Sequence, residues 1–231
     1  MPEPLSPATA QYNLSDPVLP RLLRFNLLPS LELHPAQIET LSPPAGLDRP
    51  QAPVRMALHR RWSERLLRHL GNSAAPVINR SEPALPLAIA MPQLLERLVR
   101  DLGIALLGQA LRRVVLRQEV QQARAELGLE GMNWALDGAK ALHPGLPEVR
   151  NWLSQGWAVA ADLLGSGLLA QAWHDAPSSL QKRANWRLHP LASTPELRTA
   201  SELEPIDARA LGLKLLREKD PAWLSCFPAI P

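Results

Sequence analysis

The segment DLGIALLGQALRRVVL, residues 101–116, contains ten consecutive uncharged residues, 102–111, enclosed by charged ones. Almost every side of a helix over this run is apolar or small, with Gln109 as the main exception, and such a helix is normally buried. Ten helical residues rise only about 15 Å, which is half the hydrocarbon core of a bilayer. The length of the run and its flanking arginines therefore predict a buried core helix rather than a membrane anchor.

Two glycines lie inside this run, Gly103 and Gly108. Each interior glycine costs a helix about 1 kcal/mol relative to alanine. Two of them in one buried helix predict that neighbouring helices approach it closely. We expect Gly108→Leu to overpack this contact and to destabilise the fold by about 1–3 kcal/mol.

The composition of the 231 residues favours helices throughout. Apolar residues make up 46% of the chain, which suits a folded core and argues against a disordered chain. Only 4% of the residues are aromatic and seven of these ten are Trp, so the apolar residues are mostly Leu and Ala, which favour helices. The expected fold class is therefore all-α.

The placement of proline indicates where long helices can form. Eleven of the 24 prolines lie in the first 54 residues, and none lies between Gln93 and His143. A proline inside a helix costs about 3 kcal/mol. We therefore expect a flexible tail over 1–16 and a single irregular multi-helix domain over 17–227. Its N-terminal region is Pro-rich and loosely structured, with an exposed Pro-rich loop over 42–53.

Apolar spacing extends the helical pattern along the chain. Pro92 and Gly128 suit the first turn and the end of one long helix around the opening segment. Residues 146–176 are typical of one long apolar helix, or of two helices joined at Gly165-Ser166-Gly167. Two more helices are expected, a short one over 131–145 and an amphipathic one over 205–221. The tryptophans Trp152, Trp157 and Trp173 are expected in the core.

Residues 55–70 form the clearest amphipathic pattern. One face repeats apolar residues at helical spacing, and the other face carries Arg60, Arg61, Arg65 and Arg68. The net charge of +3 and the isoelectric point near 9.5 permit contact with an acidic partner without requiring it. A solvated surface that keeps the protein soluble is one interpretation of this face. A docking surface for an acidic protein partner is the other, and both stay open.

The sequence shows no motif of catalysis or of metal binding. A phosphate-binding loop and a GxSxG turn are both missing. The histidines do not pair at metal-ligand spacing, because His34, His143 and His189 each precede a proline and are expected at turns. Cys226 has no His base near it and is interpreted as a buried thiol. We therefore expect a protein that is not an enzyme and that needs no cofactor and no metal.

The sequence also bears on where the protein acts. A single cysteine excludes an internal disulfide and favours a reducing compartment. The first residues lack the basic and apolar segments of a secretory signal, and no apolar stretch reaches the roughly 20 residues that span a bilayer. We expect a soluble cytoplasmic protein without direct membrane insertion.

Three segments resemble one known family. The helix around Gly103, Gly108, Arg112 and Arg113 resembles the signature helix of the K component of bacterial type III secretion systems, the SctK family, called YscK or PscK in particular systems. Two further segments are similar to the family's pattern, Arg24-Phe25-Asn26 with Pro29 and His34-Pro35, and Lys182-Arg183 with Arg187-Leu188-His189-Pro190. Together they cover most of residues 24–218. The tail and the loop over 42–53 are additions to the family's pattern.

The resemblance implies a non-catalytic adaptor at the cytoplasmic face of the inner membrane. Family members join the cytoplasmic domain of the inner-membrane ring protein (the D component) to the pod protein (the Q component) of the sorting platform. This role would make the protein part of an injectisome that secretes virulence proteins. The resemblance leaves open which residues contact each partner and the oligomeric state of the isolated chain.

Two other classes of function remain as alternatives. A basic helical nucleic-acid-binding protein is favoured by the isoelectric point and the Arg-rich helix. The modest net charge and the lack of a helix-turn-helix pattern argue against that class, so we expect no nucleic-acid partner. An enzyme with a dispersed site is the third class, and a pocket with perturbed carboxylates would be its first sign.

Overall fold

The structure of the chain is a computed structural model, and it describes residues 16–47 and 51–228. Within these ranges the secondary structure is helical and contains no strand, which confirms the all-α fold class. The α-helices are α1 (Val18–Leu27), α2 (Pro35–Thr40), α3 (Ala52–His69), α4 (Leu85–Ala88), α5 (Pro92–Arg113), α6 (Arg117–Leu136), α7 (Ala139–Leu142), α8 (Trp157–Ala172), α9 (Ser178–Asn185), α10 (Pro195–Arg198), α11 (Pro205–Lys219) and α12 (Pro221–Leu224). The 3-10 helices are η1 (Pro29–Leu31), η2 (Gly71–Ala74), η3 (Leu153–Gln155), η4 (Pro190–Ser193) and η5 (Thr199–Ser201).

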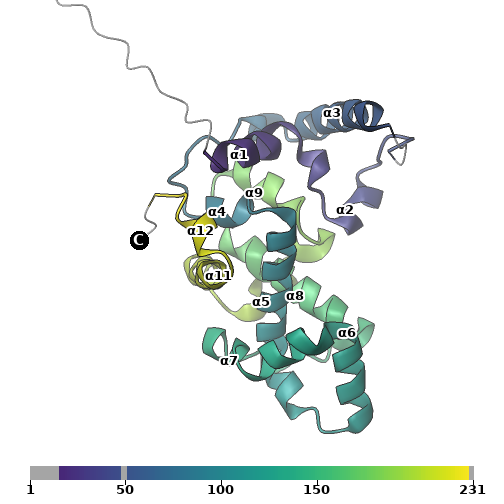
Figure 1. The fold of residues 1–231 in the computed structure, drawn as a ribbon, viewed down its shortest axis with the longest axis vertical. Coiled ribbons are helices and arrows are strands. Elements are labelled where there is room, and N and C mark those ends of the chain that lie inside the picture. Colours follow the sequence, from purple (N-terminus) through teal and green to yellow (C-terminus); the bar gives the residue numbers. More distant parts are fainter. Residues whose placement is uncertain (1–15, 48–50, 229–231) are drawn as a thin grey trace, which may run out of the picture.

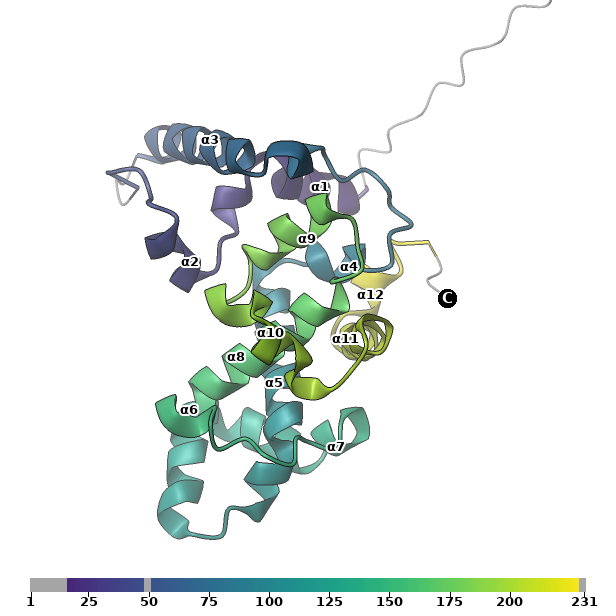
Figure 2. The ribbon, with the colours of Figure 1, turned by 180° about the vertical axis from the view of Figure 1, so that it is seen from behind.

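The helices α5 and α8 cross at the centre of an elongated molecule (Figure 1). One end of the molecule carries α1 and α3, and the opposite end carries the turn between α5 and α6 (Figures 1 and 2). The predicted tail over 1–16 lies almost entirely outside the described residues, as does part of the loop over 42–53. The boundaries of the tail, loop and domain therefore stay predictions.

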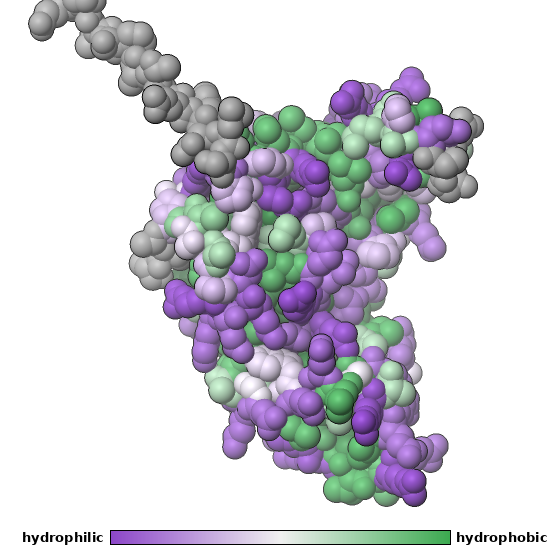
Figure 3. All heavy atoms as spheres, in the orientation of Figure 1, coloured by the Kyte–Doolittle hydropathy of each residue, from purple (hydrophilic) through white to green (hydrophobic). Residues whose placement is uncertain are grey.

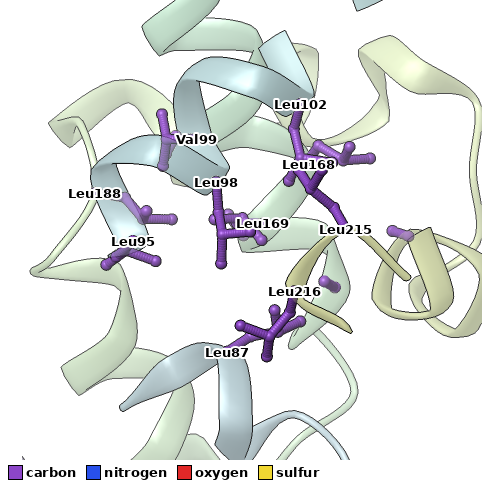
Figure 4. Close-up of a cluster of buried hydrophobic side chains, with 14 of the residues drawn as sticks. Leu87, Leu95, Leu98, Val99, Leu102, Leu168, Leu169, Leu188, Leu215 and Leu216 are labelled. Atoms are coloured by element: carbon purple, nitrogen blue, oxygen red, sulfur yellow. The ribbon is translucent and has the colours of Figure 1, made fainter. Parts of the chain in front are cut away.

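The predicted core helix is α5, and the run 102–111 is buried except at its C-terminal side. Leu98, Leu102 and Leu107 have no exposed surface. Around Leu98 and Leu102 lie leucines of α4, α8 and α11, together with Leu188, which come from distant parts of the chain (Figure 4). No helix of the described residues is long and apolar enough to cross a membrane.

Glycines set the distance between α5 and α8. A Cβ atom built on Gly103 would lie 1.8 Å from the carbonyl oxygen of Ala161 in α8. A Cβ built on Gly165 of α8 would lie 1.8 Å from the carbonyl oxygen of Val99 in α5. Both helices therefore need glycine at the contact, because any larger residue would overlap the backbone of the other helix.

The predicted close approach is wrong for the second glycine of the run. At Gly108 an added Cβ would meet only the guanidinium of Arg112, one turn further along the same helix. The space left by Gly108 accommodates this side chain, which donates to the carbonyl oxygens of Ala135 (3.3 Å) and Pro144 (2.7 Å). Gly108→Leu would therefore displace Arg112 rather than a neighbouring helix.

The single long helix predicted between Pro92 and Gly128 is interrupted in the structure. The helix that begins at Pro92 ends at Arg113, and α6 continues the chain in a new direction after residues 114–116. The predicted helix end at Gly128 is confirmed, because this glycine has a φ of 74° that interrupts the helical geometry of α6, a conformation that glycine adopts at little cost. The sequence contains no proline between 93 and 143, so nothing local marks the break at 114–116.

The predicted helix or helix pair over 146–176 is replaced by turns, η3 and one continuous helix. Helix α8 begins at Trp157 and passes through Gly165-Ser166-Gly167 without interruption, because these small residues are contact points and not a joint. Trp157 and Trp173 are buried as predicted, whereas Trp152 is only half-buried.

A buried charge cluster joins the N-terminal helices to the rest of the protein. Glu32 accepts hydrogen bonds from Arg21 at 2.5 and 2.9 Å, and its carboxylate lies 3.3 Å from Arg187. The two guanidinium groups also donate to the carbonyl oxygens of Ala88, Ile89 and Ala90. Burial lowers the pKa of Arg187 to about 10, although the nearby carboxylate opposes this shift. The cluster therefore has two cations and one anion in the protein interior.

We expect Gly103→Ala to lower the thermal midpoint of unfolding, because the new methyl group would overlap the backbone of α8. Overpacking of this kind costs about 1–3 kcal/mol, or roughly 2–4 °C per kcal/mol for a chain of this size. Gly108→Ala is the matched control, since its methyl group would meet only a movable side chain and the helix gains propensity. Thermal denaturation of both variants followed by circular dichroism checks this expectation, and equal midpoints would contradict the glycine contact.

We expect Glu32→Gln to destabilise the fold by about 3–5 kcal/mol, because it leaves two buried cations without an anion. Urea denaturation measures this loss as a lower midpoint at an unchanged slope. Asp175→Asn is the control: its carboxylate pairs with Arg209 at 2.6 Å but is 44% exposed. An exposed pair of this kind contributes about 1 kcal/mol or less. Similar losses in both variants would mean that the buried cluster does not hold the helices together.

Candidate partner-binding surface

Helix α3 projects from the end of the molecule (Figures 1 and 2). It contains five arginines and a single acidic residue, Glu64. Its C-terminal half is anchored by Trp62, Ser63 and Leu66, which are buried as their helical spacing predicts. Its N-terminal half, residues 52–57, is exposed, so this part of the helix presents its side chains to the surroundings.

The four arginines of the predicted docking surface have different roles. Arg60, Arg61 and Arg68 are exposed, and none of them forms an ion pair among the described residues. Arg65 is half-buried and donates to the carbonyl oxygens of Leu41 (3.5 Å) and Ser42. The prediction that all four share one solvent-exposed face is therefore wrong for Arg65, which fastens the end of α2 to α3. Figure 3 shows the mixture of hydrophilic and apolar side chains at this end of the molecule.

A groove lies between α2, α3 and α9. Its volume is about 750 Å³, and one wall comprises Leu66 and His69 of α3 and Leu70, the residue after that helix. The opposite wall comes from α9 and the residue after it, with Lys182 and Trp186. More than 110 positions of sequence separate the two walls, so the groove is a product of the tertiary structure.

The N-terminal segment 34–42 closes one end of this groove. The amide of His34 donates to the carbonyl oxygen of Trp186 (3.0 Å). The side chain of Gln37 donates to the carbonyl oxygens of Asn185, the last residue of α9, and of Leu188. On the other wall, Trp62 donates to the carbonyl oxygen of Leu41 (3.2 Å). The segment therefore bridges both walls and fixes the distance between them.

Polar contacts around η2 hold α9 against the segment that follows α3. The side chain of Arg183 in α9 donates to the carbonyl oxygens of Ser73 (3.1 Å) and Ala74 (2.6 Å). The hydroxyl groups of Ser73 and Ser178 are 3.1 Å apart. Because α3 is tied to α9 at both ends, the groove is a preformed feature of the fold.

The groove has a positive lining. Among the described residues that line it, Arg65, His69 and Lys182 are basic and none is acidic. Arg65 and Lys182 form no ion pair within the described part of the chain. Behind them Arg183 is buried and contacts carbonyl oxygens instead of a carboxylate, and burial lowers its pKa. The groove can therefore attract an anionic group.

A second cavity of about 320 Å³, called the waist cavity below, is lined by residues of α5, α6 and α8 together with His34 and Pro35. Its charged side chains are largely satisfied within the protein. Asp162 lies 3.4 Å from the imidazole of His34, and Glu126 accepts hydrogen bonds from the first amides of α8. These groups stabilise the local fold, and the waist cavity offers less unpaired charge than the groove.

The histidines that precede prolines lie at helix starts and turns, as predicted. The Nδ1 atoms of His34, His143 and His189 each accept a hydrogen bond from the amide two residues later, at 3.2, 3.0 and 3.3 Å. Burial lowers the pKa values of His143 and His189, which favours the neutral form that such a bond needs. Cys226 is half-buried, so the predicted buried thiol is wrong. Within the described ranges no group of three potential metal ligands gathers.

Sequence reasoning missed the buried cluster of Arg21, Glu32 and Arg187. The sequence could have indicated this cluster, because Arg21 lies between the apolar residues Pro20 and Leu22 and a charged residue inside an apolar run is either exposed or paired. The groove was also missed, since its walls are far apart in sequence. The arginines of the 60–68 region were found, because they recur at helical spacing.

The predicted signature residues occupy structural positions rather than one surface patch. Gly103 and Gly108 are buried in α5, Arg112 clamps the end of α5 to the segments after it, and Arg113 is exposed. Their pattern in the sequence therefore reflects the packing of the central helix.

Comparison with known proteins identifies the family. A family model described as YOP proteins translocation protein K (YscK) matches residues 59–228, well over half of the chain. The match includes the central helix and the basic segment at 182–190, whereas the segment at 24–35 lies outside it. No curated protein and no solved structure matches the chain. The chain therefore belongs to the YscK family of type III secretion proteins, which take part in protein translocation.

Proposed function

We propose that the protein is a non-catalytic adaptor of a type III secretion injectisome. In this role it connects the cytoplasmic domain of the inner-membrane ring protein to the pod protein of the sorting platform, at the cytoplasmic face of the membrane. Membership of the YscK family supports a role in secretion. The proposed partners follow from the resemblance of the sequence to the K components.

One observation carries the proposal: Arg60, Arg61 and Arg68 are exposed on a projecting helix and form no ion pair among the described residues. Arginine is enriched in protein interfaces, because its planar guanidinium binds carboxylates with two parallel hydrogen bonds. An adaptor also needs separate surfaces for two partners, and the elongated shape provides two ends (Figure 1).

We expect the double variant Arg61→Glu with Arg68→Glu to lose one of the two partners while the fold remains intact. Arg65 is left unchanged because its guanidinium holds residues 41 and 42. The measurement is copurification of the ring and pod proteins with the tagged chain from a secreting bacterium, after mild crosslinking. Circular dichroism verifies the helical content.

The control is Arg117→Glu with Arg124→Glu, which changes two exposed arginines of α6 at the same spacing and by the same charge. This variant should retain the partner that the first one loses. Recovery of both partners by both variants would refute the role of the α3 arginines. Recovery of nucleic acid that leaves as salt increases, in place of either protein, would refute the adaptor proposal itself.

A further inference from the structure

The groove between α2, α3 and α9 differs from the exposed arginine face in having two walls and a floor. We propose that it is the docking site for an extended acidic segment of a partner protein, and that one apolar side chain of that segment contacts the floor. This inference deepens the proposed function, because it rests on the adaptor role and names the chemistry that one partner must present.

The first argument is that the groove is preformed. Backbone and side-chain hydrogen bonds tie the segment 34–42 to both walls, and Arg183 ties α9 to η2. A rigid groove avoids the loss of conformational entropy that an induced site incurs on binding. Its volume of about 750 Å³ lies within the range of binding pockets and suits a short stretch of chain, not a folded domain.

The second argument is charge. Arg65 projects from one wall and Lys182 from the other, so an acidic chain between them would meet cations on both sides. Arg61 lies one helical turn before Arg65 and extends the positive surface beyond the mouth of the groove. No acidic side chain among the described lining residues would repel such a segment.

The third argument is the apolar floor. Leu66 and Leu70 are buried, with 4% and 6% of their surface exposed, and the half-buried Trp186 lines the same groove. Interfaces of proteins combine an apolar core with a polar rim, and a tryptophan is a common anchor. A leucine or a similar side chain between two carboxylates would match this arrangement.

The same features argue against nucleic acid as the occupant. Proteins that bind a phosphate backbone commonly neutralise about 6–10 phosphates, whereas the groove offers two permanent cations and one histidine. Single strands are bound by several aromatic platforms along a positive channel, and this groove has a single tryptophan. Nucleic acid is therefore an outcome that would overturn the proposal.

The experiment uses the purified full chain and a fluorescein-labelled peptide with four repeats of Glu-Asp-Leu. Fluorescence anisotropy measures its dissociation constant. A peptide with Ser in place of Leu removes the apolar side chains, a Lys-Lys-Leu peptide reverses the charge, and a labelled single-stranded oligonucleotide of 12 nucleotides (about the same length) tests nucleic acid.

We expect the Glu-Asp-Leu peptide to bind most tightly of the four probes. Lys182→Glu should weaken it by about tenfold or more, because it reverses the charge of one wall. Lys182 is exposed and forms no hydrogen bond or ion pair among the described residues, so the fold should be unaffected. Lys182→Arg should retain the affinity, and the matched control Lys140→Glu, an exposed lysine of α7, should change it less than about twofold.

Equal affinity in Lys182→Glu and Lys140→Glu would overturn the proposal, as would tighter binding of the oligonucleotide. The outcome can be separated from that of the adaptor proposal. If the protein does not bind the Glu-Asp-Leu peptide but both partners are still recovered from cells, the groove proposal is refuted and the adaptor role is retained. If the peptide binds but neither partner is recovered from cells, the groove binds acidic segments and the adaptor role is refuted.

Discussion

The crossing of α5 and α8 is the contact on which the rest of the structure depends. Gly103 and Gly165 let each helix touch the carbonyl oxygens of the other, and α6, α10 and α11 pack against this pair. Close contact of two backbones leaves no room for adjustment, because a single methyl group would have to displace a main chain. The central helix is therefore rigid, and the elements at both ends are positioned relative to it.

The buried cluster of Arg21, Glu32 and Arg187 has a different role. It connects α1 and the segment after η1 to the loop around residues 88–90 and to the end of α9. It adds charge-assisted hydrogen bonds to those that Asn26 forms with the backbone of Val77 and that Ser30 forms with Ser63, and such bonds fix position specifically. Arg187 follows α9 by two residues, so the contacts that hold the N-terminal region also hold the end of α9.

The groove and the exposed α3 arginines together describe how an adaptor of this kind can bind. In the proposed role, the surface arginines would attract an acidic partner over a distance, and the groove would hold a segment of it in one orientation. The central helix separates this end of the molecule from the turn between α5 and α6 (Figure 2), so the proposed adaptor role would leave the opposite end for the second partner.

The sequence determined the helical class, the buried run 102–111, the amphipathic helix at 55–70 and the family, because these depend on composition, periodicity and local motifs. It did not determine the break after Arg113, since no proline or glycine marks it. It predicted close helix contact at Gly103 and Gly108 alike, and only the packing shows that Gly108 makes room for Arg112. The buried ion cluster and the groove were decided by the tertiary structure alone. Their residues are separated by up to 166 positions, as between Arg21 and Arg187, and no local pattern records which distant side chains will meet.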